Sequence, residues 1–190
     1  MSGQKHEAIE FCEQLIDNRR LEDIYINVIS KAMQEIGTRW ENGEISIAEE
    51  HVASFLTREI LDYFKYRSIP LAAKKRPKIA LVTVEGDQHM LPLKIASDIL
   101  EAKGWEVFNL EQPLPLDDLQ NFLKNHHIDK LGISISIDEA LPTLHQMILD
   151  IKKSNENITI IVGGRTAKAH HIKGAHIVVT DMEAYDKIPF

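Results

Sequence analysis

The clearest sign of chemistry in this sequence is an acid and a histidine separated by one residue, Asp87 and His89. They directly follow a β-branched run and therefore lie in a predicted loop. A loop histidine can bind a metal when a nearby carboxylate accepts a hydrogen bond from its other ring nitrogen and fixes the ring. His89 is thus a candidate metal ligand and Asp87 its orienting acid. The alternative is that one of the nine histidines simply lies in a loop.

Two further segments carry hydroxyls or glycines next to apolar runs. Ser134 and Ser136 point to the same face, because side chains alternate along a strand. A buried hydroxyl needs a hydrogen-bond partner, which either a ligand or the local backbone could supply. Gly163 and Gly164 would let the backbone approach a ligand closely, although a plain turn from strand to helix would use the same pair.

The first half of the chain holds a third group of this kind, Trp40 followed ten residues later by Glu50 and His51. An indole offers a flat apolar wall. A carboxylate accepts hydrogen bonds from sugar hydroxyls, and a histidine could bind a metal. Taken alone, a core tryptophan and a solvated helix edge explain these residues equally well.

The elements that must position the second-half residues alternate between strand and helix. Strands are predicted over residues 78–84, 105–110, 131–137, 158–162 and 176–179, with helices over 92–103, 116–126 and about 139–153. Such alternation predicts an α/β domain with a flavodoxin-like (Rossmann-like) parallel sheet of five strands. Ligands of open parallel sheets bind at the carboxyl ends of the strands, where all three second-half segments are expected.

The first half shows apolar residues at helical spacing and predicts a helical bundle. Ser46 and Glu49 have the spacing of a capping box, which marks the start of its third helix. We therefore predict an N-terminal helical bundle cap over residues 1–68, a linker over 69–77 that carries a basic run, and a ligand-binding α/β domain over 78–190.

The order and spacing of the three second-half segments resemble the cobalamin-binding signature of corrinoid proteins. That signature has an Asp-x-His-x-x-Gly box, a Ser-x-Leu box and a Gly-Gly box. Here Asp87 and His89 stand in the first box, with Pro92 in place of its glycine. Ser134 opens the second box, with Ser136 in place of its leucine.

The resemblance implies a specific mode of cofactor binding. His89 would coordinate cobalt from below, replacing the dimethylbenzimidazole base of the cofactor, and Asp87 would orient it. The base and its nucleotide tail would enter a cleft of the sheet. Ser134 would hydrogen-bond the buried base, and Gly163 and Gly164 would make room for it.

The helical half looks like the cap of the light-sensing, adenosylcobalamin-dependent transcriptional repressors. The resemblance implies that Trp40 packs against the adenosyl group over the upper face of the corrin. Glu50 and His51 would complete this pocket, and His51 could become an upper ligand of cobalt once the alkyl group is lost. No basic recognition helix is evident, so we expect output to pass through a partner protein.

We therefore predict a non-enzymatic cobalamin sensor of photoreceptor type that holds adenosylcobalamin between cap and sheet domain. Methylcobalamin and hydroxocobalamin are the other forms considered. Signalling would involve a homo-oligomer or a partner regulatory protein and would regulate transcription indirectly. The first alternative is a corrinoid carrier subunit of a methyltransferase or mutase. The second is a haem- or bilin-binding sensor of the same fold.

Charge and composition narrow the classes of partner. The formal net charge of −7 argues against direct binding to nucleic acid or to an anionic membrane. The single cysteine, Cys12, excludes an intrachain disulfide. No long apolar run or signal peptide is evident, so we expect a cytoplasmic protein.

Overall fold

The protein was studied as a computed structural model that describes residues 2–16, 21–68, 77–181, 184–185 and 188–189. The chain divides into two compact units, Met1–Pro70 and Leu71–Phe190. None of the described helices combines the length and apolar character needed to cross a membrane.

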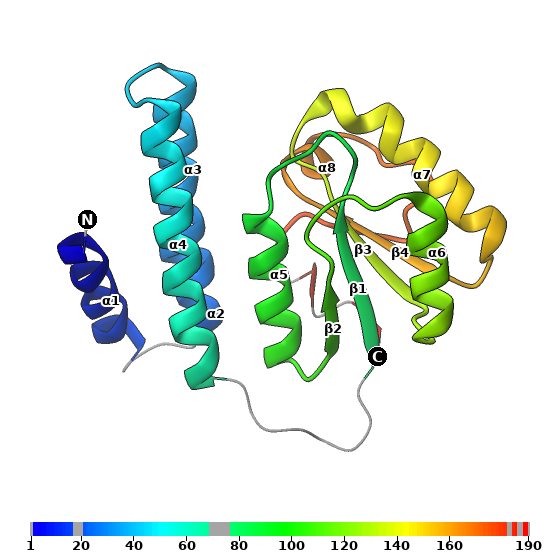
Figure 1. The fold of residues 1–190 in the computed structure, drawn as a ribbon, viewed down its shortest axis with the longest axis horizontal. Helices are drawn as coiled ribbons and strands as arrows, with labels where there is room; N and C mark the ends of the chain where they lie inside the picture. Colours follow the sequence, from blue (N-terminus) through cyan, green and yellow to red (C-terminus); the bar gives the residue numbers. More distant parts are fainter. Residues whose placement is uncertain (1, 17–20, 69–76, 182–183, 186–187, 190) are drawn as a thin grey trace. The chain divides into compact units, whose positions relative to one another are not determined.

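The first unit is helical throughout its described part (Figure 1). Its elements are α1 (Ser2–Ile16), α2 (Leu21–Ile24), a π-helical turn (Tyr25–Ile29), α3 (Ser30–Glu41) and α4 (Ile47–Ser68). Tyr25 is buried and donates a hydrogen bond from its hydroxyl to the carbonyl oxygen of Leu61, at 3.1 Å. This contact joins the π-helical turn to α4 in the core of the bundle.

The start of α4 confirms the predicted capping box. The backbone N–H of Ser46 donates to the Glu49 carboxylate at 2.7 Å, and the Glu49 N–H donates to the Ser46 hydroxyl at 3.3 Å. These contacts satisfy backbone groups that the first turn of a helix leaves free. They also hold the pKa of Glu49 below its ordinary value.

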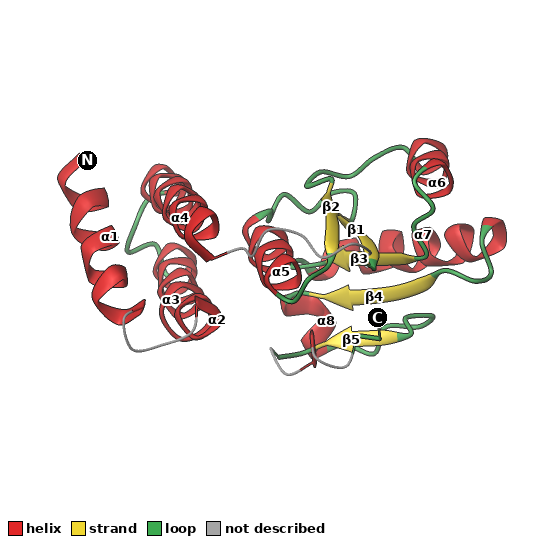
Figure 2. Ribbon diagram, turned by 90° about the horizontal axis from the view of Figure 1, so that it is seen from below, coloured by secondary structure: helices red, strands yellow, loops and turns green. Residues whose placement is uncertain are grey.

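The second unit is a five-stranded parallel sheet, which confirms the predicted α/β class. Its strands are β1 (Lys78–Thr83), β2 (Glu106–Asn109), β3 (Lys130–Ser134), β4 (Thr159–Gly163) and β5 (Ile177–Val179). They lie in the order β2-β1-β3-β4-β5, with every pairing parallel (Figure 2). This is the strand order of flavodoxin-like folds.

Two apolar cores lie on opposite faces of the sheet. The helices of this unit are α5 (Leu91–Ala102), α6 (Leu116–Asn125), α7 (Leu141–Ser154) and α8 (Arg165–Ala169), with a 3-10 turn at Asp138–Ala140. Leu119 of α6 and Leu144 of α7 pack in one core. Leu93 and Leu100 of α5 pack in the other, together with Trp105.

The described elements differ from the sequence predictions in two places. The third strand ends at Ser134 instead of residue 137, because the backbone N–H of Ser136 donates to the side chain of Asp87 and not to a neighbouring strand. The short helix α8 was not predicted, since five residues are too few to show an apolar stripe.

Candidate functional site

The candidate site lies at the carboxyl edge of the sheet, where β1 and β3 end. The chain leaves β1 toward β2 on one side, and β3 lies on the other side of β1. Such a reversal of strand order opens a crevice between the two strand ends, which is the usual ligand position in this type of fold. The last residues of β3 and β4 and the loops after β1, β3 and β4 carry all of the second-half residues that the sequence indicated.

Asp87 and His89 form a direct pair in the loop after β1. The Nδ1 atom of His89 lies 2.7 Å from Oδ1 of Asp87, and the backbone N–H of His89 donates to the same oxygen at 2.9 Å. The other carboxylate oxygen, Oδ2, accepts the backbone N–H of Ser136. The Asp87 side chain is 0% exposed, whereas that of His89 is 53% exposed.

The charge of Asp87 decides which ring nitrogen of His89 donates to it. Burial on its own raises the pKa of Asp87, but the hydrogen bonds from His89 and from the Ser136 amide outweigh it and hold that pKa below its ordinary value. An ionised carboxylate can only accept, so Nδ1 of His89 carries the hydrogen. In metal-binding histidines, a carboxylate on one ring nitrogen orients the ring so that the other nitrogen can face the metal.

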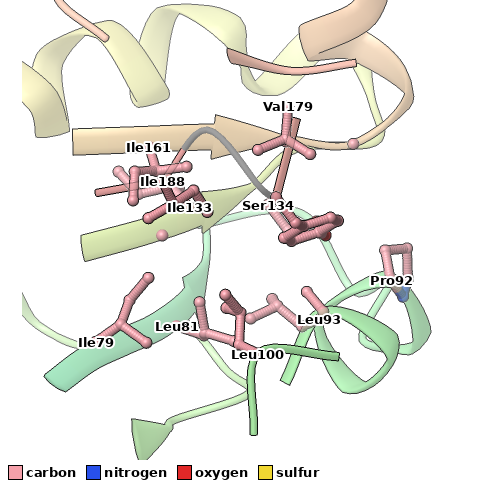
Figure 3. Close-up of a pocket in the computed structure, with 15 residues that line it drawn as sticks. Ile79, Leu81, Pro92, Leu93, Leu100, Ile133, Ser134, Ile161, Val179 and Ile188 are labelled. Atoms are coloured by element: carbon pink, nitrogen blue, oxygen red, sulfur yellow. The ribbon is translucent and has the colours of Figure 1, made fainter. Parts of the chain in front are cut away.

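A cavity of about 60 Å³ lies between the sheet and α5, and Pro92, three residues after His89, lines it (Figure 3). Most of its wall is apolar and includes Ile79, Leu81, Leu93, Leu100, Ile133 and Ile161. The hydroxyl of Ser134 also lines it and is buried without a hydrogen-bond partner among the described residues. Buried hydroxyls in folded proteins normally have a hydrogen-bond partner. The Ser134 hydroxyl is therefore a candidate donor to a bound ligand.

The cavity suits a flat apolar group with one acceptor atom, which is the character of the cofactor's base. The residues present therefore fit this group in their chemistry.

Gly132 of β3 is a site residue that the sequence reasoning missed. It lines the cavity, and a Cβ atom at this position would lie 2.5 Å from Cδ2 of Leu81. A lone glycine inside a strand often marks a place where another group approaches the backbone closely. That signal was present in the sequence.

The two serines and the two glycines have different surroundings. Ser134 lines the cavity, while Ser136 does not and instead holds Asp87 through its backbone amide. Gly163 and Gly164 both line the cavity. Gly164 also has a φ of 108°, and a Cβ there would collide with the Ile135 carbonyl, so it permits a close approach of two loops.

The helical-unit candidates lie on both sides of the turn that joins α3 to α4. Trp40, at the end of α3, is 44% exposed. Glu50 and His51 lie in the first turns of α4, with His51 Nδ1 2.6 Å from Oε2 of Glu50. The other oxygen of Glu50 accepts the Ser54 hydroxyl at 2.7 Å. Trp40 and His51 are therefore both accessible within this unit.

No group of three or more His, Cys, Asp or Glu side chains could hold a metal ion within the described ranges. A bare ion generally needs several protein ligands. A single histidine suits a metal that a macrocycle already holds, where the protein supplies an axial ligand.

Comparison with known proteins identifies the type of domain. Residues 1–65 and residues 77–184 each match a family model described as a B12 binding domain. Among curated proteins, dimethylamine corrinoid protein 1 of Methanosarcina acetivorans is 25% identical over 142 residues, which cover 73% of this chain and 67% of that protein.

Solved structures share the fold. The monomethylamine corrinoid protein of Methanosarcina barkeri aligns with a TM-score of 0.73 and 17% identity, covering 96% of this chain and 92% of that one. The methanol:cobalamin methyltransferase complex of the same organism aligns with a TM-score of 0.51 and 17% identity. The alignment covers 97% of this chain and 72% of the other.

Proposed function

The chain belongs to the B12-binding domain family and is a corrinoid-binding protein, and we propose that it is the corrinoid carrier of a methyltransferase system. The observation that carries this proposal is the pair of Asp87 and His89 in the loop after β1, together with the apolar cavity that Pro92 and Ser134 line. Together they offer one oriented imidazole and, in Ser134, one hydroxyl that has no partner in the part of the chain that the structure describes. These are the two contacts that a corrinoid bound through a histidine needs from below.

Each site residue has a proposed task in holding the cofactor. The bound corrinoid would supply a cobalt centre that accepts and releases a methyl group. His89 would bind that cobalt through Nε2, and Asp87 would keep the ring in the required tautomer. Ser134 would donate to the inserted base, while Gly163 and Gly164 leave space at the cavity wall. The chain itself would not activate the methyl donor, which is the task of a partner enzyme.

The relatives favour the carrier over the sensor that the sequence analysis ranked first. Those named above are corrinoid proteins for methylamines and a methyltransferase complex. None of them is a light sensor or a transcriptional regulator. The family assignment also favours a corrinoid over haem or bilin.

The binding mode can be tested by reconstitution with methylcobalamin and hydroxocobalamin. We expect an absorption spectrum typical of a histidine-bound, base-displaced corrinoid. His89→Ala should abolish that signature, because it removes the axial nitrogen. His127→Ala, in the turn at the end of α6, is the matched control and should leave the spectrum unchanged. An unaltered spectrum in the His89 variant would contradict the assigned ligand.

Carrier activity is tested by methyl transfer. Protein loaded with methylcobalamin carrying an isotopic label should exchange its methyl group with the substrate of a methyltransferase encoded beside it. Label that stays on the protein under all such pairings would argue against a carrier.

A sensor remains the second candidate because of the exposed Trp40 and the accessible pair of Glu50 and His51. We propose these three residues as contacts to an upper adenosyl group in that case, with His51 as the possible upper ligand. Protein loaded with adenosylcobalamin would then change its spectrum and its elution volume under green light. If Trp40→Ala left both responses intact, this role of the cap residues would fail.

A further inference from the structure

We propose that Thr166 and Asp138 are positioning residues for the His89 imidazole, which they control through a single peptide group. This inference rests on the proposed role of His89 as the cobalt ligand. It adds Asp138, in the 3-10 turn that follows β3, and Thr166, in α8 after β4, which are both far from His89 in the sequence.

The peptide group in question joins Ile135 to Ser136. Its N–H donates to Oδ2 of Asp87, the carboxylate that holds His89. Its carbonyl oxygen accepts the backbone N–H of Thr166 at 3.3 Å. A hydrogen bond to the carbonyl of a peptide group polarises its N–H, so the two bonds strengthen one another. A continuous series of hydrogen bonds thus runs from Thr166 to the imidazole.

The side chain of Thr166 fixes the start of this series. Thr166 is 1% exposed, and its hydroxyl donates to Oδ1 of Asp138 at 2.8 Å. Oδ2 of Asp138 lies 3.0 Å from Nε2 of His170. The hydrogen bonds from Thr166 and then from His170 hold the pKa of Asp138 below its ordinary value, so it remains an ionised acceptor.

The surrounding backbone leaves Ile135 little freedom. Its N–H donates to the carbonyl of Gly163 at 2.9 Å, and Gly164 permits the close approach of its carbonyl group. The next carbonyl, that of Ser136, accepts from Nε of Arg165 at 3.3 Å. The loop after β3 is therefore joined at several points to the segment that begins α8. A displacement of α8 would move the amide that orients Asp87.

The decisive experiment compares Thr166→Val with the wild-type protein in two measurements. The first is hydrogen exchange of the Ser136 amide in the cofactor-free protein, followed by NMR. Thr166→Val removes the hydrogen bond from the Thr166 hydroxyl to the charged Asp138. If the Ser136 amide depends on that bond, its exchange rate should increase about tenfold. The second is the hyperfine splitting from a histidine nitrogen in the electron paramagnetic resonance spectrum of the bound, reduced cob(II)alamin, with ¹⁵N-labelled histidine to separate it from the ¹⁴N splitting of the cofactor's own base. The fraction of molecules that show this splitting should fall in the variant.

Matched variants separate positioning from general damage. Thr166→Ser keeps the hydroxyl and should restore both signals. Asp138→Ala, at a side chain that is 63% exposed, should change both in the same direction as Thr166→Val and covers the case in which the valine variant does not fold. Asp150→Asn changes another carboxylate that accepts two side-chain hydrogen bonds, from Gln146 and Lys153, and should change neither signal.

The outcomes distinguish this inference from the proposed function. Wild-type exchange and hyperfine signals in both Thr166→Val and Asp138→Ala would overturn the inference. A wild-type protein that binds cobalamin without splitting from a histidine nitrogen would refute His89 as ligand, and with it the inference. Faster exchange at Ser136 together with an unchanged hyperfine signal would also overturn it, because the amide would then not control the imidazole.

Discussion

At the scale of single residues, Ser134 should have opposite effects on two quantities. It should lower the stability of the cofactor-free protein and raise the affinity for cobalamin. Its hydroxyl is buried without a partner among the described residues, and an unpaired buried hydroxyl is destabilising. We predict that Ser134→Ala stabilises the cofactor-free protein by about 1 kcal/mol. The same change should weaken cobalamin binding by about tenfold, because the base loses its donor.

Urea unfolding of the cofactor-free protein and equilibrium dialysis with hydroxocobalamin measure the two effects. Ser154→Ala is the control, since that hydroxyl donates to the Ile151 carbonyl at 2.9 Å at the end of α7. It should lower stability slightly and leave binding unchanged. If Ser134→Ala lowered stability as well, the hydroxyl would have a partner within the protein.

At the scale of elements, β3 needs a glycine at position 132 to keep the cavity open. Gly132→Ala places a Cβ 2.5 Å from Cδ2 of Leu81. That atom is the end of a flexible side chain and can turn into the cavity, so we expect only a modest loss of stability. Binding of cobalamin in the histidine-bound form should be lost, because Leu81 would then occupy the space of the base.

Spectra of the reconstituted Gly132→Ala protein test this. Gly37→Ala, in α3 with nothing within 4 Å of the added atom, is the control. It should raise stability by about 0.5–1 kcal/mol, since glycine weakens a helix relative to alanine. A Gly132 variant that keeps the wild-type spectrum would show that the base lies elsewhere.

The stability of the second unit should depend on pH through His176, which contacts the start of β4. Nδ1 of His176 accepts the backbone N–H of Ile160 at 2.9 Å, which only a neutral ring can do. Burial, and then the nearby Lys152, hold the pKa of His176 below its ordinary value of 6.5. The folded state therefore favours the neutral ring. Its contribution to stability is complete above pH 6.5 and is lost as the pH falls through the lower, folded-state pKa.

Unfolding curves of the wild type and of His176→Ala between pH 8 and pH 5 measure this contribution. The difference in stability between the two proteins should shrink as the pH falls. A difference that stays constant over this range would show that His176 does not titrate differently in the folded state.

The sequence predicted elements well where a regular pattern exists. The β-branched run that forms β1 and the capping box of Ser46 and Glu49 are local signals, and the structure has both. The proposed positioning residues Thr166 and Asp138 could not be predicted, because their hydrogen bond joins the 3-10 turn to α8 over 28 residues of sequence. The hydrogen bond from the Ser136 amide to Asp87 could not be predicted either, because every residue except proline has a backbone N–H.

At the scale of the whole molecule, the division into two units predicts that the second unit can bind the cofactor by itself. Asp87, His89 and every residue that lines the cavity belong to the unit Leu71–Phe190, which has its own apolar cores. We therefore predict that a fragment of residues 71–190 folds and binds hydroxocobalamin with the same histidine-bound spectrum as the full chain. The helical unit would then not be needed for ligation by His89.

Circular dichroism establishes whether the fragment folds, and its spectrum with hydroxocobalamin is compared with that of the full chain. His89→Ala within the fragment should abolish the signature, as in the full chain. The unmutated fragment could also fold and bind cobalamin but lack the spectrum of histidine ligation. Residues 1–70 would then be needed to bring the His89 imidazole to cobalt. The ligand set would then be a property of both units, and the hydrogen-bond series from Thr166 to His89 would not be sufficient to place the ring.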